Sequence, residues 1–150
     1  MNGIRKRVLT TLVFGLALAV GAANAQPGDS NGDGRADILW RNGVTGQNWL
    51  YLMDGASIVG SMGINTVAGA DWQIVGNGDY NGDGMADMLW RNSATGQNWM
   101  FLMNGATITS SVGVNTVAGA DWKVVGNGDY NGDTRADILF LNSAYCDNSM

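Results

Sequence analysis

An acidic nine-residue loop occurs three times in this chain, and its repeated polar side chains all contain oxygen atoms. The first copy, from Asp29 to Asp37, reads DSNGDGRAD, and the copies at 79–87 and 129–137 repeat its acids at the same spacing. Oxygen-bearing side chains stand at positions 1, 3, 5 and 9. Alternate residues of a tight loop can direct their oxygens toward one centre, and a calcium ion takes about six to eight oxygens at ~2.3–2.6 Å. The pattern therefore predicts a calcium site in each loop.

Each predicted site uses four side chains and one backbone carbonyl. The carbonyl is that of position 7, and for this reason the side chain there is free to vary. The predicted metal residues are Asp29, Asn31, Asp33, Arg35 and Asp37 in the first loop, Asp79, Asn81, Asp83, Met85 and Asp87 in the second, and Asp129, Asn131, Asp133, Arg135 and Asp137 in the third. Glycine at position 6 (Gly34, Gly84) permits a positive φ. Thr134 holds that position in the third loop, where strain of roughly 1–2 kcal/mol should make calcium affinity the weakest.

The same residues allow two other interpretations, an EF-hand and a hairpin without metal. An EF-hand needs a bidentate acid at position 12, yet Trp40, Trp90 and Phe140 stand there and the chain has no Glu. A hairpin rich in Asx turns could form without any metal. Acids gathered at matched spacing would repel one another without a cation, which favours calcium.

The sequence contains few residues that could act as catalytic groups. The chain has no histidine, so Ser-His-Asp and Cys-His mechanisms are excluded. Outside the loops only Asp54, Asp71, Asp121 and Asp147 remain, a poor basis for the paired carboxylates of glycoside hydrolysis. We expect no catalytic residue and no enzyme activity. The single cysteine, Cys146, allows neither an internal disulfide nor a thiolate zinc site.

The elements that position the loops recur with them, in a repeat of 50 residues. The units are 29–78, 79–128 and a partial third, 129–144, after which the match ends at Tyr145. A fixed period in this range indicates a solenoid or a propeller. Within one unit the patterns predict strands at 72–76, 88–92, 98–103 and 107–114. In the last strand Ile108, Val112 and Val114 should share one face, whereas the strand 98–103 is apolar on both faces and should be covered on both.

We therefore predict an all-β fold, a partial β-propeller of four-stranded blades with a 50-residue repeat. Helical repeats are disfavoured by the glycine content and the Asn-Gly and Asp-Gly dipeptides. Propellers close with about four to eight blades, more than this chain supplies. Either several chains form a homo-oligomer, or the chain is the remainder of a longer one, which the abrupt end of the repeat favours. The first unit also lacks its first strand, because Gln26-Pro27-Gly28 replaces it.

The repeat units resemble the FG-GAP or VCBS-type repeats of integrin α-chain propellers and of many bacterial secreted proteins. The resemblance rests on Gly76 to Gly84 (GNGDYNGDG) and Ala86 to Asn92 (ADMLWRN), and it covers nearly all of the chain after the leader. It implies a bladed propeller with calcium in the loop that joins the first two strands of a blade. It implies no single function.

The N-terminus resembles a secretory signal peptide. Arg5, Lys6 and Arg7 precede an apolar run, and Ala23-Asn24-Ala25 supplies a cleavage pattern, so residues 1–25 are the expected leader and 26–150 the repeat region. The run is too short for a membrane span. Without the leader, five Lys and Arg face thirteen Asp, a net charge near −8. Nucleic acid is therefore a poor partner, and we expect a secreted or cell-surface protein.

Three roles remain open for such a module. It could bind a protein or glycan ligand, as in cell adhesion, or act as a calcium-dependent lectin in which Trp49 and Trp99 stack on sugar rings. Because these tryptophans lie in apolar strands, a place in the blade core is the competing interpretation. It could also be a purely structural spacer stabilised by calcium. We expect Arg41 and Arg91 to pair with a turn carbonyl or with an Asp of the neighbouring loop.

Overall fold

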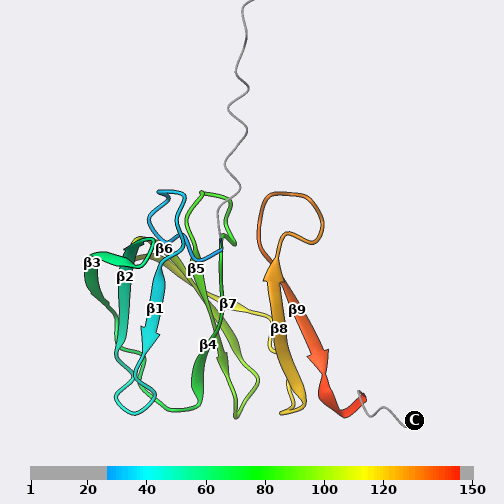
Figure 1. Cartoon of the computed structure of the whole chain (residues 1–150). Coiled ribbons are helices and arrows are strands. Elements are labelled where there is room, and N and C mark those ends of the chain that lie inside the picture. Colours follow the sequence, from blue (N-terminus) through cyan, green and yellow to red (C-terminus); the bar gives the residue numbers. More distant parts are fainter. Residues whose placement is uncertain (1–26, 146–150) are drawn as a thin grey trace, which may run out of the picture.

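The computed structural model describes residues 27–145, which fold into three antiparallel β-sheets that follow one another along the chain (Figure 1). The first contains β1 (Ile38–Arg41), β2 (Asn48–Asp54) and β3 (Ser57–Ile64). The second contains β4 (Trp72–Gly78), β5 (Asp87–Asn92), β6 (Asn98–Asn104) and β7 (Thr107–Val114). The third pairs β8 (Trp122–Gly128) with β9 (Asp137–Asn142) and is followed by a single 3-10 turn, η1 (Ser143–Tyr145). The predicted all-β fold is confirmed.

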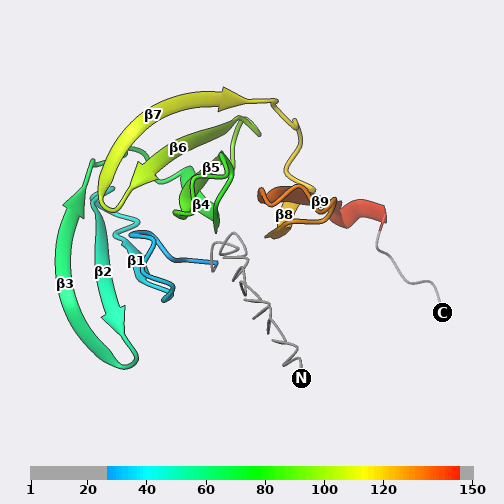
Figure 2. The ribbon, with the colours of Figure 1, turned by 90° about the horizontal axis from the view of Figure 1, so that it is seen from above.

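The second sheet is the four-stranded blade expected from the sequence. Its strands pair in chain order, β4-β5-β6-β7, with the predicted outer strand at the edge. Seen from above, β1 and β4 lie toward the middle of the molecule, and β3 and β7 form its outer arcs (Figure 2). The arrangement is a partial propeller, and the three sheets do not close into a ring. The predicted leader, 1–25, and Cys146 lie outside the described residues, and within 27–145 no helix is long and apolar enough to cross a membrane.

One prediction for the outer strand is wrong, because a β-bulge interrupts it. Ile108 lies opposite Met103, but Val112 lies opposite Met100, and the register shifts between Leu102 and Met103. Directly opposed residues share a face of the sheet, so Ile108 and Val112 point to opposite faces. Ile108 packs against the core, whereas Val112 is 44% exposed.

The hydrophobic core lies between the first and second sheets. Its buried side chains come from both sheets and are Leu50, Ile64, Met88, Trp90 and Met103. Fully burying a large apolar side chain contributes about 1.5–3 kcal/mol, so this interface is the main stabilising contact between sheets. The third sheet contacts the rest chiefly through β4 and β8, and its residues are far less buried.

A repeated arginine links each sheet to the next one. The Arg41 guanidinium lies 4.8 Å from the ring centre of Trp90, and Arg91 lies 5.6 Å from that of Phe140. Arg91 also donates to the carbonyls of Gly96 and Val117 at 3.0 and 2.8 Å. The predicted pairing with a turn carbonyl is confirmed, and the stacking on the next sheet's aromatic ring is an addition to it.

The first unit lacks an inner strand, as its sequence predicts. The first sheet begins with β1, which corresponds to β5, the second strand of the complete blade. One bond of the missing pair remains, since the Asp37 N–H donates to the Gly28 carbonyl at 2.8 Å. One long edge of β1 is therefore without a neighbouring strand in the described chain.

Candidate metal centre

The three acidic loops lie together at one end of the sheets (Figure 1). The second loop joins β4 to β5, and the third joins β8 to β9. This is the link between the first two strands of a blade, the place that the resemblance implies. The first loop precedes β1 directly, and its Asp29 and Ser30 are 2% and 5% exposed.

The first acid of each loop organises the turn. Asp79 accepts the Gly82 and Asp83 N–H groups on Oδ1, at 2.6 and 3.1 Å, and the Gly84 N–H on Oδ2, at 2.8 Å. Asp29 and Asp129 accept the equivalent bonds in their own loops. These bonds require position 6 to turn with positive φ, which is 89° at Gly84. The predicted positive φ is thus confirmed, and Thr134 has it too, at 72°.

Positions 3 and 5 form a second set of bonds. In the second loop Asn81 Oδ1 accepts the Asp83 N–H at 2.8 Å, and Asn81 Nδ2 donates to Asp83 Oδ2 at 2.9 Å. Asp83 Oδ1 in turn accepts the Met85 N–H at 2.9 Å. The other two loops contain the same bonds. The side chains of positions 3 and 5 are thereby held next to each other with their oxygens on the loop.

The acid at position 9 ties the loop to the blade. Asp87 is fully buried, and it accepts the Tyr80 N–H at 2.9 Å and the Met103 N–H of β6 at 2.8 Å. Burial raises the pKa of Asp87 to about 6, its two backbone hydrogen bonds oppose this rise, and the charges of Asp83 and Asp79 add to it. The three carboxylates of the second loop are therefore close enough to interact, and their combined charge is unfavourable by itself.

The same position is held alike in the first loop and differently in the third. Asp37 accepts the Ser30 and Met53 N–H groups, both at 3.0 Å, as Asp87 does in its own loop. Asp137 accepts the Tyr130 N–H at 3.0 Å, but its Oδ1 accepts Asn131 Nδ2 at 3.4 Å. The described part of the third unit has no third strand to supply an amide. Hydrogen bonds from the Thr134 N–H and its neighbours lower the pKa of the exposed Asp129.

The side chains at position 7 contact other parts of the chain in each loop. Met85 lies near Gly32, and Arg135 lies near Gly82, so each touches the preceding loop. Arg35 instead pairs with Asp54 at 3.4 Å and with Asp33 at 3.8 Å. Contacts of this kind leave only the backbone carbonyl of position 7 as a possible ligand, which is the role predicted for it.

The residues present fit calcium by their donor chemistry. Each loop offers carboxylate and amide oxygens, the ligands that hard cations prefer. In the third loop Asp133 and Asp137 both approach the same Asn131 Nδ2, at 3.3 and 3.4 Å, so two carboxylates already converge on one positively polarised group. In the conformation shown, however, residues 27–145 contain no group of three or more acids arranged to hold a metal ion. The ligand set stays a prediction.

Comparison with known families identifies the segment that contains two of these loops. Residues 79–140 match a family model described as an FG-GAP-like repeat. Over these residues the chain is similar to FG-GAP-like repeats. The resemblance expected from the sequence is confirmed here, and the match runs from the second loop through β5, β6, β7 and β8 into β9, without β4. Curated proteins and solved structures gave no match.

The exposure of two tryptophans was not predicted correctly from the sequence. Trp49 and Trp99 are 44% and 41% exposed, so the expectation of covered faces along their strands is wrong at these positions. Each indole Nε1 donates to a serine of the outer strand, Ser61 or Ser111, at 2.7 Å. Each ring lies over a glycine, Gly63 or Gly113. The small outer-strand residues opposite each tryptophan were the available signal.

Proposed function

We propose that this chain is an exported, calcium-stabilised propeller module without catalytic activity, which presents a ligand-binding surface outside the cell. The observation that carries the proposal is the repetition of one oxygen pattern in three loops that share one hydrogen-bond geometry. The FG-GAP-like repeat of residues 79–140 supports the propeller-type module. Rigid loops on a sheet scaffold are a common place for recognition.

The chain's own residues divide the work of the proposed site. Asp79 holds the turn through three backbone N–H groups, and Asp87 links the loop to β6. Asn81 and Asp83 present the remaining side-chain oxygens, and Met85 offers its carbonyl. Calcium, when bound, supplies the positive charge that offsets these acids. Loop and blade are thereby expected to become more stable together, since the ion binds only the folded loop.

Thermal unfolding and calorimetric titration of the purified chain test this proposal. At a calcium concentration of 100 times Kd, one site stabilises the folded state by about 2.7 kcal/mol relative to chelator. Asp83→Asn removes one charge from the second loop and replaces one carboxylate oxygen with an NH2 group, while its Oδ1 can still accept the Met85 N–H. We expect it to weaken one calcium site at least tenfold. Asp71→Asn removes an exposed acid outside the loops and serves as the control.

The outcomes separate clearly. Equal melting temperatures in calcium and in chelator, with no heat of calcium binding, would contradict the proposal. A loss of affinity in Asp71→Asn as large as in Asp83→Asn would show that net charge alone, and not the loop, attracts the ion.

A lectin is the second candidate, and the exposure of two tryptophans favours it. Trp49 and Trp99 occupy equivalent places in the first two sheets, and each indole is fixed by a serine and a glycine. A flat, rigid aromatic face is the surface on which a sugar ring stacks. Fixing the ring before binding also reduces the entropy lost on binding.

Glycan-array binding distinguishes the lectin from a ligand-free spacer. A lectin should bind a glycan in calcium, lose it in chelator, and lose it in the Trp99→Ala variant while the blade stays folded by circular dichroism. Val44→Ala is the control for loss of an exposed apolar side chain, since Val44 is 97% exposed in the turn between β1 and β2. A folded, calcium-stabilised chain that binds no glycan or protein would support the structural spacer instead.

A further inference from the structure

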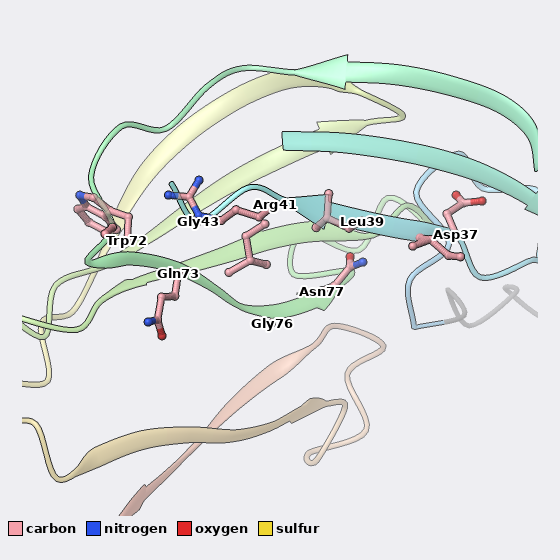
Figure 3. Close-up of a pocket in the computed structure, with 11 residues that line it drawn as sticks. Asp37, Leu39, Arg41, Gly43, Trp72, Gln73, Gly76 and Asn77 are labelled. Carbon is pink, nitrogen blue, oxygen red and sulfur yellow. The ribbon is translucent and has the colours of Figure 1, made fainter. Parts of the chain in front are cut away.

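One cavity of the described chain lies where the first unit lacks its inner strand. It has a volume of about 730 Å³ and lies between the open edge of β1 and the neighbouring strand β4 (Figure 3). Ile38, Leu39 and Arg41 line it from β1, and Trp72, Ile74 and Asn77 line it from β4. We call this cavity the strand groove. One end of it reaches Asp37, the last acid of the first loop, and the rest is lined by residues outside the loops.

The repeat itself shows what fits the strand groove. In the complete blade the place beside β5 is filled by β4, which reads WQIVGNG, and beside β9 it is filled by β8, which reads WKVVGNG. Both pairs have the same register, since Ile74 lies opposite Trp90 and Val124 lies opposite Phe140. An extended strand of this sequence could therefore pair with β1, opposite Trp40 in the same register.

The chain's own preceding residues are a poor occupant. Residues 22–27 read Ala-Ala-Asn-Ala-Gln-Pro, where the second unit has Trp72 to Asn77. They have none of the aromatic and β-branched residues that the strand uses, and Pro27 has no N–H to donate.

We propose that the strand groove accepts β8 of a second copy of this chain, so that β8 of one copy and β1, β2 and β3 of the next form a four-stranded blade. In this exchange β1 takes the place of β9 beside β8. The two strands have similar sequences: both contain Ile-Leu, and β1 then has Trp40 and Arg41 where β9 has Phe140 and Leu141. Exchange of equivalent elements between copies requires few new contacts, because it reuses those already present within one copy.

The exposure of the first sheet supports this exchange. Trp40 is 54% exposed, whereas its equivalent Trp90 is 1% exposed, because the first sheet and Arg41 cover Trp90. Ile38 is 40% exposed, and its equivalent Met88 is 2% exposed. In the composite arrangement, the second sheet of the neighbouring copy would cover this face. Arg91 of the partner would then stack on Trp40 as it now stacks on Phe140.

A buried polar atom in the strand groove also has no partner in the single chain. Asn77 Oδ1 is buried and makes no hydrogen bond in the described structure. In the next unit, the equivalent Asn127 donates from Nδ2 to the Asn77 carbonyl at 2.8 Å, which links two inner strands. By the repeat, Asn77 Nδ2 should donate the same bond to a carbonyl of an inner strand in the first unit, and Asn77 Oδ1 would then need an N–H donor of that strand. A buried polar group without a partner costs about 1–3 kcal/mol, and the missing strand would bring polar backbone groups to it.

The proposal fixes the size of the assembly. Each chain would contribute two full blades, the second sheet and one composite blade. Because propellers close with about four to eight blades, rings of two, three or four copies are the closed forms. Contacts of this head-to-tail kind close into a ring or continue as a filament.

Sedimentation of the full chain, in calcium and in chelator, is the first test. We expect a mass two to four times the 15.8 kDa of one chain. A monomer at micromolar concentration in both conditions would overturn the proposal, and this result would leave calcium binding untouched.

Paired cysteines then test the exchange itself, in a Cys146→Ser background. Asn127 lies opposite Ile138 within one chain, and by the repeat it should lie opposite Ile38 of the next chain. Oxidation of the pair Ile38→Cys and Asn127→Cys should give covalent multimers that reductant resolves. The pair Asn127→Cys and Ile138→Cys should lock β8 to β9 and give monomers, which reassemble on reduction. Multimers that persist in the oxidised, locked variant would show that copies associate without strand exchange, and the proposal would be wrong.

Discussion

The backbone at Thr134 offers a direct measurement of strain in the third loop. Thr134 has φ of 72°, the conformation that the equivalent Gly84 adopts at 89°. Its N–H must point at Asp129 Oδ2, at 2.9 Å, as the Gly84 N–H points at Asp79. The hydrogen bond therefore holds a β-branched residue in the left-handed region. We expect Thr134→Gly to stabilise the chain and Gly84→Thr to destabilise it.

Two opposing effects set the magnitude. Relief of the left-handed conformation contributes roughly 1–2 kcal/mol, and the greater freedom of glycine in the unfolded chain offsets about 0.4–1 kcal/mol of it. The expected net change is about 0.5–1 kcal/mol in each direction, or roughly 2–5 °C in melting temperature. Steric effects do not confuse the comparison, because a Cβ added at Gly84 meets no atom within 4 Å.

Urea unfolding followed by tryptophan fluorescence, in chelator, gives both changes in the free energy of unfolding. The double variant is the control: the two sites lie in different loops, so their effects should add and nearly cancel. In calcium, Thr134→Gly should also raise the affinity of the weakest site. If Thr134→Gly is neutral or destabilising while Gly84→Thr is harmless, positive φ is not strained here and the reasoning fails.

Two further predictions concern the contacts between elements. Gly96→Ala should destabilise the chain by about 2 kcal/mol or more, since a Cβ there overlaps the Val117 carbonyl. Gly105 has φ of 58° and open space around it, so Gly105→Ala should cost about 1 kcal/mol or less in the same urea assay. Arg91→Ala should cost about 3 kcal/mol or more, because buried carbonyls lose their charged donor, whereas Arg35→Ala should unfold close to wild type by calorimetry, since its ion pairs are solvent-exposed. Equal effects within either pair of variants would contradict the assigned contacts.

The blade was predictable because the repeat states its pattern more than once. The strand 107–114 was placed at both of its ends, and the loop 79–87 was placed between the correct two strands. Turn chemistry decides such boundaries: Asn104-Gly105 ends one strand and starts the next. The absence of the inner strand in the first unit also followed from residues, since Gln26-Pro27-Gly28 has no strand pattern.

Other features depended on contacts between distant residues and could not be predicted. The bulge in β7 shifts the register by one residue, and no local pattern marks it, so the faces of Ile108 and Val112 were wrong. The stacking of Arg41 on Trp90 joins residues of different units, and no pattern within one unit indicates which aromatic ring of the next sheet lies beside the arginine. Exposure of Trp99 depends on how sheets pack, which the alternation within one strand does not state.

How firmly each loop holds its predicted ligands depends more on the neighbouring strands than on the ligand residues themselves. All three loops have the acids of positions 1, 5 and 9, but within residues 27–145 only the first two have a third strand whose amide, from Met53 or Met103, holds the last acid. In the third loop Asp137 pairs with Asn131 instead, which draws a predicted ligand onto another one. A third loop of identical sequence would still be less well fixed than the second. Replacing Thr134 should therefore improve the third site without making it equal to the second, until a third strand stands beside β9.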